Sequence, residues 1–213
     1  MKWKLLGALL CAGACSAQPF EFGGLIGYGW YRDVRVNSVA GEATAGIRNR
    51  FVAGAIFGDD LYQHIAGEVR YLYHDGDPFL SMGGVRGNVQ GQSHSLSYDV
   101  LLHLHEKDYK FRPYVAAGLG AKYYRVSGPA PVPQPLPQIA TLTTVSDWLI
   151  QYDFGFGMKY RLQRHIYLRA DFRDYITPFP KKIFAPTGNA TDRGLFQQFT
   201  PTVGLSYAFD LHP

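Results

Sequence analysis

The sequence predicts an all-β fold, an eight-stranded antiparallel up-and-down β-barrel that crosses a membrane with its strands. Three observations predict it. Eight segments alternate apolar with polar or small residues, the connections between them alternate between short and long, and the polar face of the strands is rich in glycine. Because successive side chains on a strand point to opposite faces, each segment has one apolar face.

The composition narrows the class of protein. The chain has 213 residues, of which 46% are hydrophobic and 18% charged, so it has the length of one domain and is too apolar to be disordered. After residue 17, no stretch of roughly 20 residues is free of charged or polar side chains, which excludes a polytopic helical membrane protein. The formal net charge is +4, whereas a nucleic-acid binder usually carries more positive charge on one face. We therefore expect no nucleic-acid partner.

Residues 1–17 have the features of a secretory signal peptide. Lys2 and Lys4 precede a short apolar stretch, and small residues end it. This pattern predicts export through the Sec pathway with cleavage after Ala17. The mature chain would then be residues 18–213, which we assign to a single barrel domain.

Both cysteines, Cys11 and Cys15, fall in this leader. A conventionally cleaved chain would therefore hold its fold without a disulfide. Lipidation of Cys15 is an alternative to conventional cleavage, because Ala12–Cys15 is loosely similar to a lipobox.

The strands follow one another with the same alternation. In the clearest of them, every even position from Trp148 to Leu162 is apolar or aromatic, whereas the odd positions include glycines and charged residues. A helix would scatter these residues around its circumference. In chain order, the predicted strands lie at 20–30, 51–57, 65–73, 96–104, 115–123, 148–162, 166–172 and 199–209. Their apolar faces carry Phe22 and Ile26, Phe51 and Phe57, Val69 and Tyr71, Leu96 and Tyr98, Val115 and Leu119, Phe154 and Phe156, Leu168 and Phe172, and Val203 and Leu205.

The connections fall into two classes. Those at 58–64, 106–111 and 163–165 are short, and those at 33–43, 75–93, 128–146 and 177–194 are long. Short turns at one end and long loops at the other are typical of barrels in the bacterial outer membrane. Closure is required there, because an open sheet edge in hydrocarbon would leave backbone groups unpaired. Both termini are then expected at the short-turn, periplasmic end.

Glycine decides which face points outward. On the polar face of the strands, nine positions are glycine, a residue that is unfavourable on an exposed strand but leaves room inside a narrow barrel. The apolar parity is therefore predicted to contact lipid, unlike in a soluble lipocalin-type barrel. Aromatic residues near the strand ends would form interfacial girdles: Tyr28, Trp30, Tyr73, Tyr123, Trp148, Tyr160 and Phe209.

Charged residues of both signs share the inward parity. An isolated charge inside the barrel would be costly, so we predict a network of ion pairs that closes the lumen. The members of this predicted network are Glu68, Arg70, Asp99, Lys122, Asp153, Lys159, Arg169, Asp171 and Arg173. Glu21, Arg48, Arg50 and Arg161 share the same parity. The alternative is a conducting or substrate-guiding path.

The last strand carries a specific motif. Residues 202–209 contain a polar residue, a glycine and two hydrophobic residues at fixed spacing. These are Thr202, Gly204, Tyr207 and Phe209. With this motif, the chain resembles the small outer-membrane β-barrel proteins related to the transmembrane domain of outer-membrane protein A. The resemblance implies an assembly signal recognised by the barrel-assembly machinery. The chain departs from the pattern in that residues 210–213 follow the phenylalanine that is usually terminal.

Histidines offer two chemical alternatives, neither of them complete. His103 and His105 have the spacing of metal ligands on one strand face, but no third ligand is identifiable. His94 and Ser97 invite comparison with barrel enzymes that modify lipid A, yet in a regular strand they lie on opposite faces. We therefore expect no catalysis, no metal and no cofactor.

The long loops carry the other candidate contacts. The proline-rich stretch 129–137 predicts a stiff, exposed segment, and 75–91 is expected to be a flexible loop. Basic loop residues are candidates for contacts with lipopolysaccharide phosphates: Arg86, Lys181, Lys182 and Arg193.

The sequence thus favours a monomeric outer-membrane barrel with a structural or surface-interaction role, in contact with outer-membrane lipid. Two rivals stay open. One is a transport barrel resembling outer-membrane protein W, which a lateral gap between strands lined by Leu25, Val52, Ile56 or Leu72 would favour. The other is a barrel enzyme that modifies lipid A, which would need a histidine, a hydroxyl and an acid converging at the outer rim.

Overall fold

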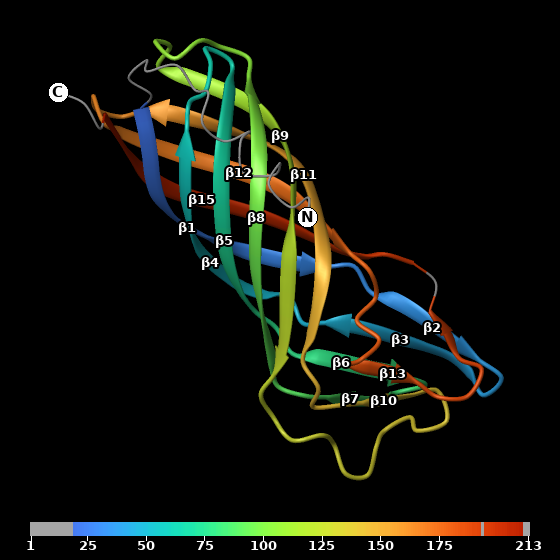
Figure 1. Cartoon of the computed structure of the whole chain (residues 1–213). Coiled ribbons are helices and arrows are strands. Elements are labelled where there is room, and N and C mark those ends of the chain that lie inside the picture. The colour runs from blue at the N-terminus through green and yellow to red at the C-terminus, as the bar shows by residue number, and fades with distance from the viewer. Residues whose placement is uncertain (1–18, 193, 211–213) are drawn as a thin grey trace, which may run out of the picture.

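The computed structural model describes residues 19–192 and 194–210. Eight long antiparallel strands form a closed barrel in the order β1-β15-β12-β11-β9-β8-β5-β4 (Figure 1). Their bounds are β1 Pro19–Tyr31, β4 Arg50–Asp59, β5 Ile65–Asp75, β8 Gly91–His103, β9 Phe111–Val126, β11 Asp147–Arg161, β12 Ile166–Thr177 and β15 Phe196–Asp210. The predicted fold is confirmed. The predicted signal peptide, residues 1–17, lies outside the described residues.

The first and last barrel strands close the sheet. Pro19 lies opposite Asp210, and β1 pairs on its other side with β4. Both ends of the described chain therefore lie at the end of the barrel that carries the short turns (Figure 1). Within residues 19–192 and 194–210, no helix is long and apolar enough to cross a membrane.

The two faces of the strands differ as predicted. Phe154, Phe156 and Leu205 are more than half exposed on the outside, whereas Asp153 and Arg169 are at most 1% exposed inside. Only the surrounding hydrocarbon of a bilayer makes this distribution favourable, because in water it would expose the apolar face and bury the charges. The bulky apolar residues therefore face lipid.

Inward glycines allow neighbouring strands to approach each other. A Cβ atom on Gly120 would lie 2.2 Å from the carbonyl oxygen of Leu96, and one on Gly155 would lie 2.2 Å from that of Phe172. A Cβ on Gly24, which faces outward, would meet nothing closer than 4.0 Å. The inner surface of the barrel is thus too crowded at these inward positions for any side chain.

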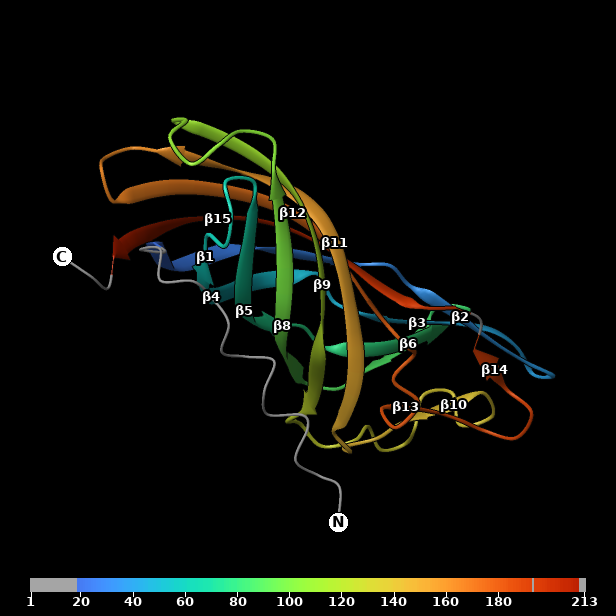
Figure 2. The ribbon, with the colours of Figure 1, turned by 45° about the horizontal axis from the view of Figure 1, so that its top comes forward.

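The long connections contain short strands, which corrects the expectation that 75–91 is a loop. They contain β2 Val34–Ser38, β3 Gly41–Ile47, β6 Pro78–Met82, β7 Val85–Asn88, β10 Ala140–Leu142, β13 Phe184–Pro186 and β14 Thr191–Asp192. These strands form a five-stranded sheet, β14-β2-β3-β6-β7, and a two-stranded sheet, β10-β13. Figure 2 shows them gathered at one end of the barrel, and we call residues 32–49, 76–90, 127–146 and 178–192 the cap.

The cap has its own hydrophobic core. Val36, Ala45 and Leu80 of the larger sheet are fully buried together with Phe184 of the smaller one. The core continues into the mouth of the barrel through Tyr124. The loops are therefore ordered by mutual burial of apolar side chains rather than by their local sequence.

The proline-rich stretch 129–137 is only partly exposed, which also corrects its prediction. The side-chain amide of Gln134 donates to the Leu142 carbonyl at 3.0 Å and accepts from the Leu142 N–H at 3.0 Å. Leu136 is 2% exposed in the cap core, whereas Val132 at the tip is 94% exposed. The segment is thus anchored at one end and projects at the other.

Candidate functional site

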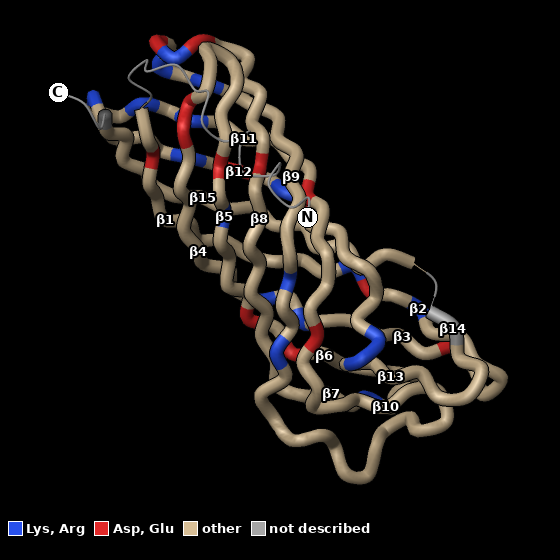
Figure 3. The backbone as a smooth tube through the Cα atoms, in the orientation of Figure 1, with Lys and Arg blue, Asp and Glu red and all other residues tan. Residues whose placement is uncertain are grey.

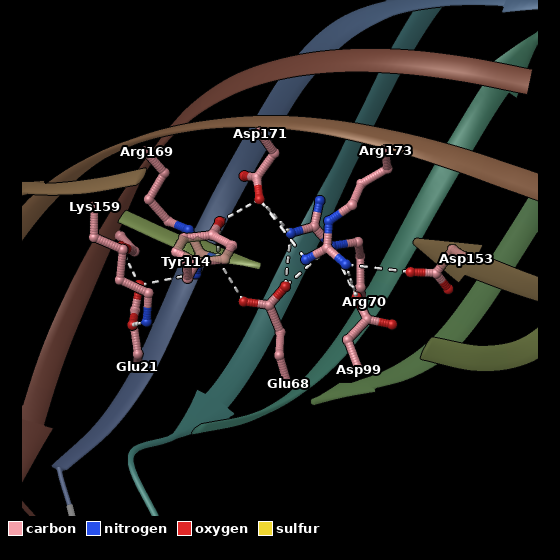
Figure 4. A network of polar contacts seen from close by, with 11 residues as sticks. Glu21, Glu68, Arg70, Asp99, Tyr114, Asp153, Lys159, Arg169, Asp171 and Arg173 are labelled. Atoms are coloured by element: carbon pink, nitrogen blue, oxygen red, sulfur yellow. Dashed lines mark hydrogen bonds and ion pairs between the residues drawn. The ribbon is translucent and has the colours of Figure 1, made fainter. Parts of the chain in front are cut away.

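The candidate site is the charged interior of the barrel, which begins at Glu21 near the short-turn end. Its carboxylate lies 2.5 Å from Lys159 Nζ and 2.9 Å from Arg169 Nη1. Ser206 Oγ donates to the same carboxylate at 2.5 Å. Strands β1, β11, β12 and β15 are thereby connected across the lumen (Figure 4).

Glu68 connects the group around Glu21 to the middle of the barrel. One of its oxygens lies 2.6 Å from Arg169 Nη2 and the other 2.7 Å from Arg70 Nη2. Tyr114 on β9 accepts a hydrogen bond from Arg169 at 3.1 Å and donates to Asp171. Each guanidinium therefore holds more than one acceptor, an arrangement that suits the fixed fork of arginine donors.

The part of the network nearer the cap contains two arginines and three aspartates. Arg70 lies 3.1 Å from Asp171 and 3.5 Å from Asp99. Arg173 Nη1 lies 3.2 Å from Asp153 and 3.3 Å from Asp99. The side chains of these five residues are at most 1% exposed. Figure 3 shows the charges of both signs on neighbouring strands in the part of the barrel away from the cap.

Eight of the nine predicted residues lie in this network: Glu68, Arg70, Asp99, Asp153, Lys159, Arg169, Asp171 and Arg173. Glu21, Tyr114 and Ser206 join them, so that seven of the eight barrel strands contribute. Glu21 carried a usable signal, since it has the inward parity. Tyr114 and Ser206 are uncharged, so a search for inward-facing charges could not find them.

Lys122 does not join the network. Its ammonium donates to Gln198 and lies 5.3 Å from the ring centres of both Tyr31 and Tyr124. Parity placed it correctly inside the barrel, but it lies four residues beyond Gly118, which pairs with Asp99. Four residues of a strand span about 13 Å, which separates Lys122 from the carboxylates along the barrel axis.

Two other inward charges predicted by parity lie elsewhere. Arg48 is exposed in the two-residue link between β3 and β4. Arg50 is at the cap end, where it forms ion pairs with Asp75 at 3.0 Å and Asp77 at 2.7 Å. The ion pairs of Arg50 connect the base of the cap to the barrel rim, and neither arginine lines the lumen.

The wall formed by β1, β4 and β5 contributes an apolar cluster to the lumen. Leu25, Val52, Ile56 and Leu72 are buried together with Tyr175 of β12. Each of the first four has a partner on both neighbouring strands; Leu25, for instance, pairs with Gly204 and Gly54. The sheet is therefore continuous where the transport alternative placed a lateral gap.

The candidate catalytic and metal-binding histidines are dispersed. His94 faces outward and contacts Tyr71, whereas Ser97 is buried in the lumen. His103 lies inside against Tyr114, and His105 follows the end of β8 and stacks on Tyr109. Among residues 19–192 and 194–210, no group of three or more His, Cys, Asp or Glu residues is arranged to hold a metal ion.

A polar cleft of about 680 Å³ lies where the cap meets the ends of β1 and β15. It is lined by Arg32, Asp33, Arg35, Asn37, Glu42 and Gln197, among others. Partial burial raises the pKa of the Asp33 carboxyl, and the positive charge of Arg86 opposes this shift. Charges of both signs thus line the cleft.

The proposed assembly signal lies on β15. Thr202 is buried inside the barrel, and Tyr207 is 52% exposed outside. Phe209 stacks on Phe20 of β1, with ring centres 6.1 Å apart. The motif therefore lies at the seam that closes the barrel, on the strand that is synthesised last.

Comparisons with known proteins agree with this geometry. A family model described as outer membrane protein beta-barrel domain matches residues 5–209. The structure is similar to Neisserial surface protein A, with a TM-score of 0.51 and 13% identity over 91% of this chain and 98% of the other. It is also similar to the outer membrane protein OprG from Pseudomonas aeruginosa, with a TM-score of 0.52 and 14% identity over 91% and 96% of the two chains. A comparison with curated proteins found no match in sequence.

Proposed function

Because this chain belongs to the outer membrane protein β-barrel domain family, we propose that it is a sealed barrel with a structural or surface-interaction role, exercised through its cap. The observation that carries this proposal is the network that crosses the lumen from Glu21 to Asp153. A second support is the cap, whose core gives the exposed loops a fixed shape. A fixed shape favours binding, because less conformational entropy is lost when a partner docks.

Planar-bilayer recording tests the sealed lumen. We expect the purified protein to give no large, steady single-channel currents, because buried ion pairs occupy the cross-section of the barrel. As a control, the variant Glu68→Ala/Arg70→Ala/Arg169→Ala should conduct, since it removes the central side chains of the network. Steady currents from the unmodified protein would overturn the proposal and favour transport.

Cysteine labelling on intact cells tests which end faces outward. Val39→Cys and Val132→Cys should react with a membrane-impermeant maleimide, because these residues are 99% and 94% exposed in the cap. Tyr62→Cys, at the opposite end and 68% exposed, should react only after the cells are opened. The unmodified chain reports any labelling of Cys11 and Cys15. Labelling of Tyr62→Cys alone on intact cells would reverse the orientation and contradict the role of the cap.

The family membership also supports recognition of β15 by the barrel-assembly machinery. We infer that Thr202, Gly204, Tyr207 and Phe209 carry this recognition, because two of them face outward next to β1, where the sheet closes.

A further inference from the structure

Four rings form one straight row across the outside of the barrel. Tyr73 on β5, His94 on β8, Tyr123 on β9 and Trp148 on β11 lie directly opposite one another in the register of these neighbouring strands. Their ring centres are 5.5, 6.4 and 4.6 Å apart in that order. The row is therefore a continuous aromatic surface, which we call the ring row.

The ring row is held in place by hydrogen bonds as well as stacking. His94 Nδ1 lies 2.8 Å from the Tyr71 hydroxyl, and His94 Nε2 lies 3.5 Å from the Gln92 side-chain nitrogen. The Tyr73 hydroxyl donates to Gln92 Oε1 at 3.2 Å. These contacts fix the rings before any ligand arrives, which lowers the entropy lost on binding.

The type of outward-facing residue changes from one row to the next on either side of the ring row. One step further from the cap, the outward row is Tyr71, Leu96, Ala121 and Ile150. One step toward the cap, the outward row is Asp75, Gln92 and Arg125. Apart from Tyr71, the order from the membrane interior to the rim is therefore aliphatic, aromatic and then charged or polar.

Arg125 is the free cation of this sector. It is exposed, and none of the described residues forms an ion pair or hydrogen bond with its side chain. The nearby carboxylate of Asp75 is engaged by Arg50 at 3.0 Å. Lys182, a basic residue that the sequence indicated as a candidate for contacts with lipopolysaccharide phosphates, is paired with Asp147 at 2.7 Å.

We propose that the ring row and Arg125 form a binding site for a phosphorylated glycolipid of the outer leaflet. A sugar ring would pack against Trp148, the 66% exposed ring at the end of the row, its phosphate would accept hydrogen bonds from the Arg125 guanidinium, and an acyl chain would lie along Leu96 and Ile150. A guanidinium binds phosphate through two parallel hydrogen bonds, and an aromatic face suits the apolar side of a sugar. This site lies on the lipid-facing wall, so the inference is independent of the sealed lumen, but it rests on the proposed outward orientation of the cap end.

Native mass spectrometry of the full-length protein purified in mild detergent tests the site. The probes are bisphosphorylated lipid A, the same lipid without its phosphates, and phosphatidylglycerol. We expect binding of the first to exceed the other two, and Arg125→Gln to weaken it about tenfold, because a charge-assisted hydrogen bond is lost. Arg125→Lys should fall between, since it keeps the charge but loses the fork.

Arg32→Gln is the matched control. Arg32 is also an exposed arginine at the cap end, but it lies on the far side of the barrel, after β1, where it donates to Gln197 at 3.0 Å. Its loss should leave lipid A binding unchanged. Equal weakening by both variants would mean a diffuse attraction to the rim, and equal binding of phosphatidylglycerol would mean that any anionic lipid suffices; either result would overturn the site.

Folding is monitored by the heat-dependent gel shift of a folded barrel. If Arg125→Gln fails to fold, His94→Phe supplies a second variant, which keeps the ring stack but removes the two hydrogen bonds of the imidazole. We expect it to retain the fold and to weaken lipid A binding. Unchanged binding in a folded Arg125→Gln protein would refute the proposal.

Discussion

Arg169→Met is expected to lower the free energy of unfolding by about 3–5 kcal/mol, because it leaves buried carboxylates without their partner. Arg169 lies 2.9 Å from Glu21 and 2.6 Å from Glu68, and its side chain is fully buried. Methionine fills a similar volume but neutralises neither carboxylate. Urea unfolding of the protein in lipid vesicles, followed by tryptophan fluorescence, measures the change.

Two comparisons identify the cause of this loss. Arg161→Met removes an arginine at the short-turn rim, whose guanidinium donates to the Asp108 carbonyl. Because that side chain is accessible to solvent, we expect a change within about 0.5 kcal/mol. The double variant Glu68→Gln/Arg169→Met should be more stable than Arg169→Met alone, since the uncompensated charge is removed with its partner. A double variant that is no more stable would show that packing, and not charge, dominates.

The lumen network illustrates what an alternating sequence can predict. Parity alone assigns Asp153, Lys159 and Arg169 to the inside, because a closed sheet in lipid has only two faces. Parity does not say which charges meet, since this depends on the relative register of strands far apart in the chain. Arg70 and Asp171 are 101 residues apart, yet their atoms lie 3.1 Å apart. Lys122 shares their parity but lies at another depth.

The cap was not predictable for a related reason. Its core joins Val36, Leu80 and Phe184, which come from three different loops. Each loop contains only a few apolar residues between prolines, glycines and charges, so none shows the sustained alternation that marked the barrel strands. Only the barrel, by holding the loop ends together, brings these residues close enough to bury one another.

The outward-facing ring row shows the same dependence on strand register. Tyr73, His94, Tyr123 and Trp148 have the parity of lipid-facing residues, and three of them were expected in a girdle near the strand ends. Their alignment in one row again depends on register, which the sequence of a single strand does not contain. His94 in particular looks like a candidate catalytic residue until its neighbours are known.

Gly120→Ala is expected to destabilise the barrel by about 3 kcal/mol, the upper end of the range for overpacking. Its added methyl group would lie 2.2 Å from the Leu96 carbonyl oxygen and 2.7 Å from the Ser97 Cα atom. Both atoms belong to the backbone of β8, so neither can rotate away as the end of a side chain could. The two strands would have to separate, which would lengthen their hydrogen bonds.

Gly24→Ala is the matched control, because Gly24 is also in a barrel strand but faces lipid. Neither glycine has a positive φ, so alanine suits both backbones, and only the surroundings differ. A methyl group at Gly24 would lie 4.0 Å from the nearest atom, the Gly54 carbonyl oxygen. Gly24→Ala should therefore be neutral or stabilise by up to about 1 kcal/mol, through the reduced entropy of the unfolded chain. Equal unfolding midpoints for the two variants would disprove the steric explanation and leave glycine on the inner face without a physical reason.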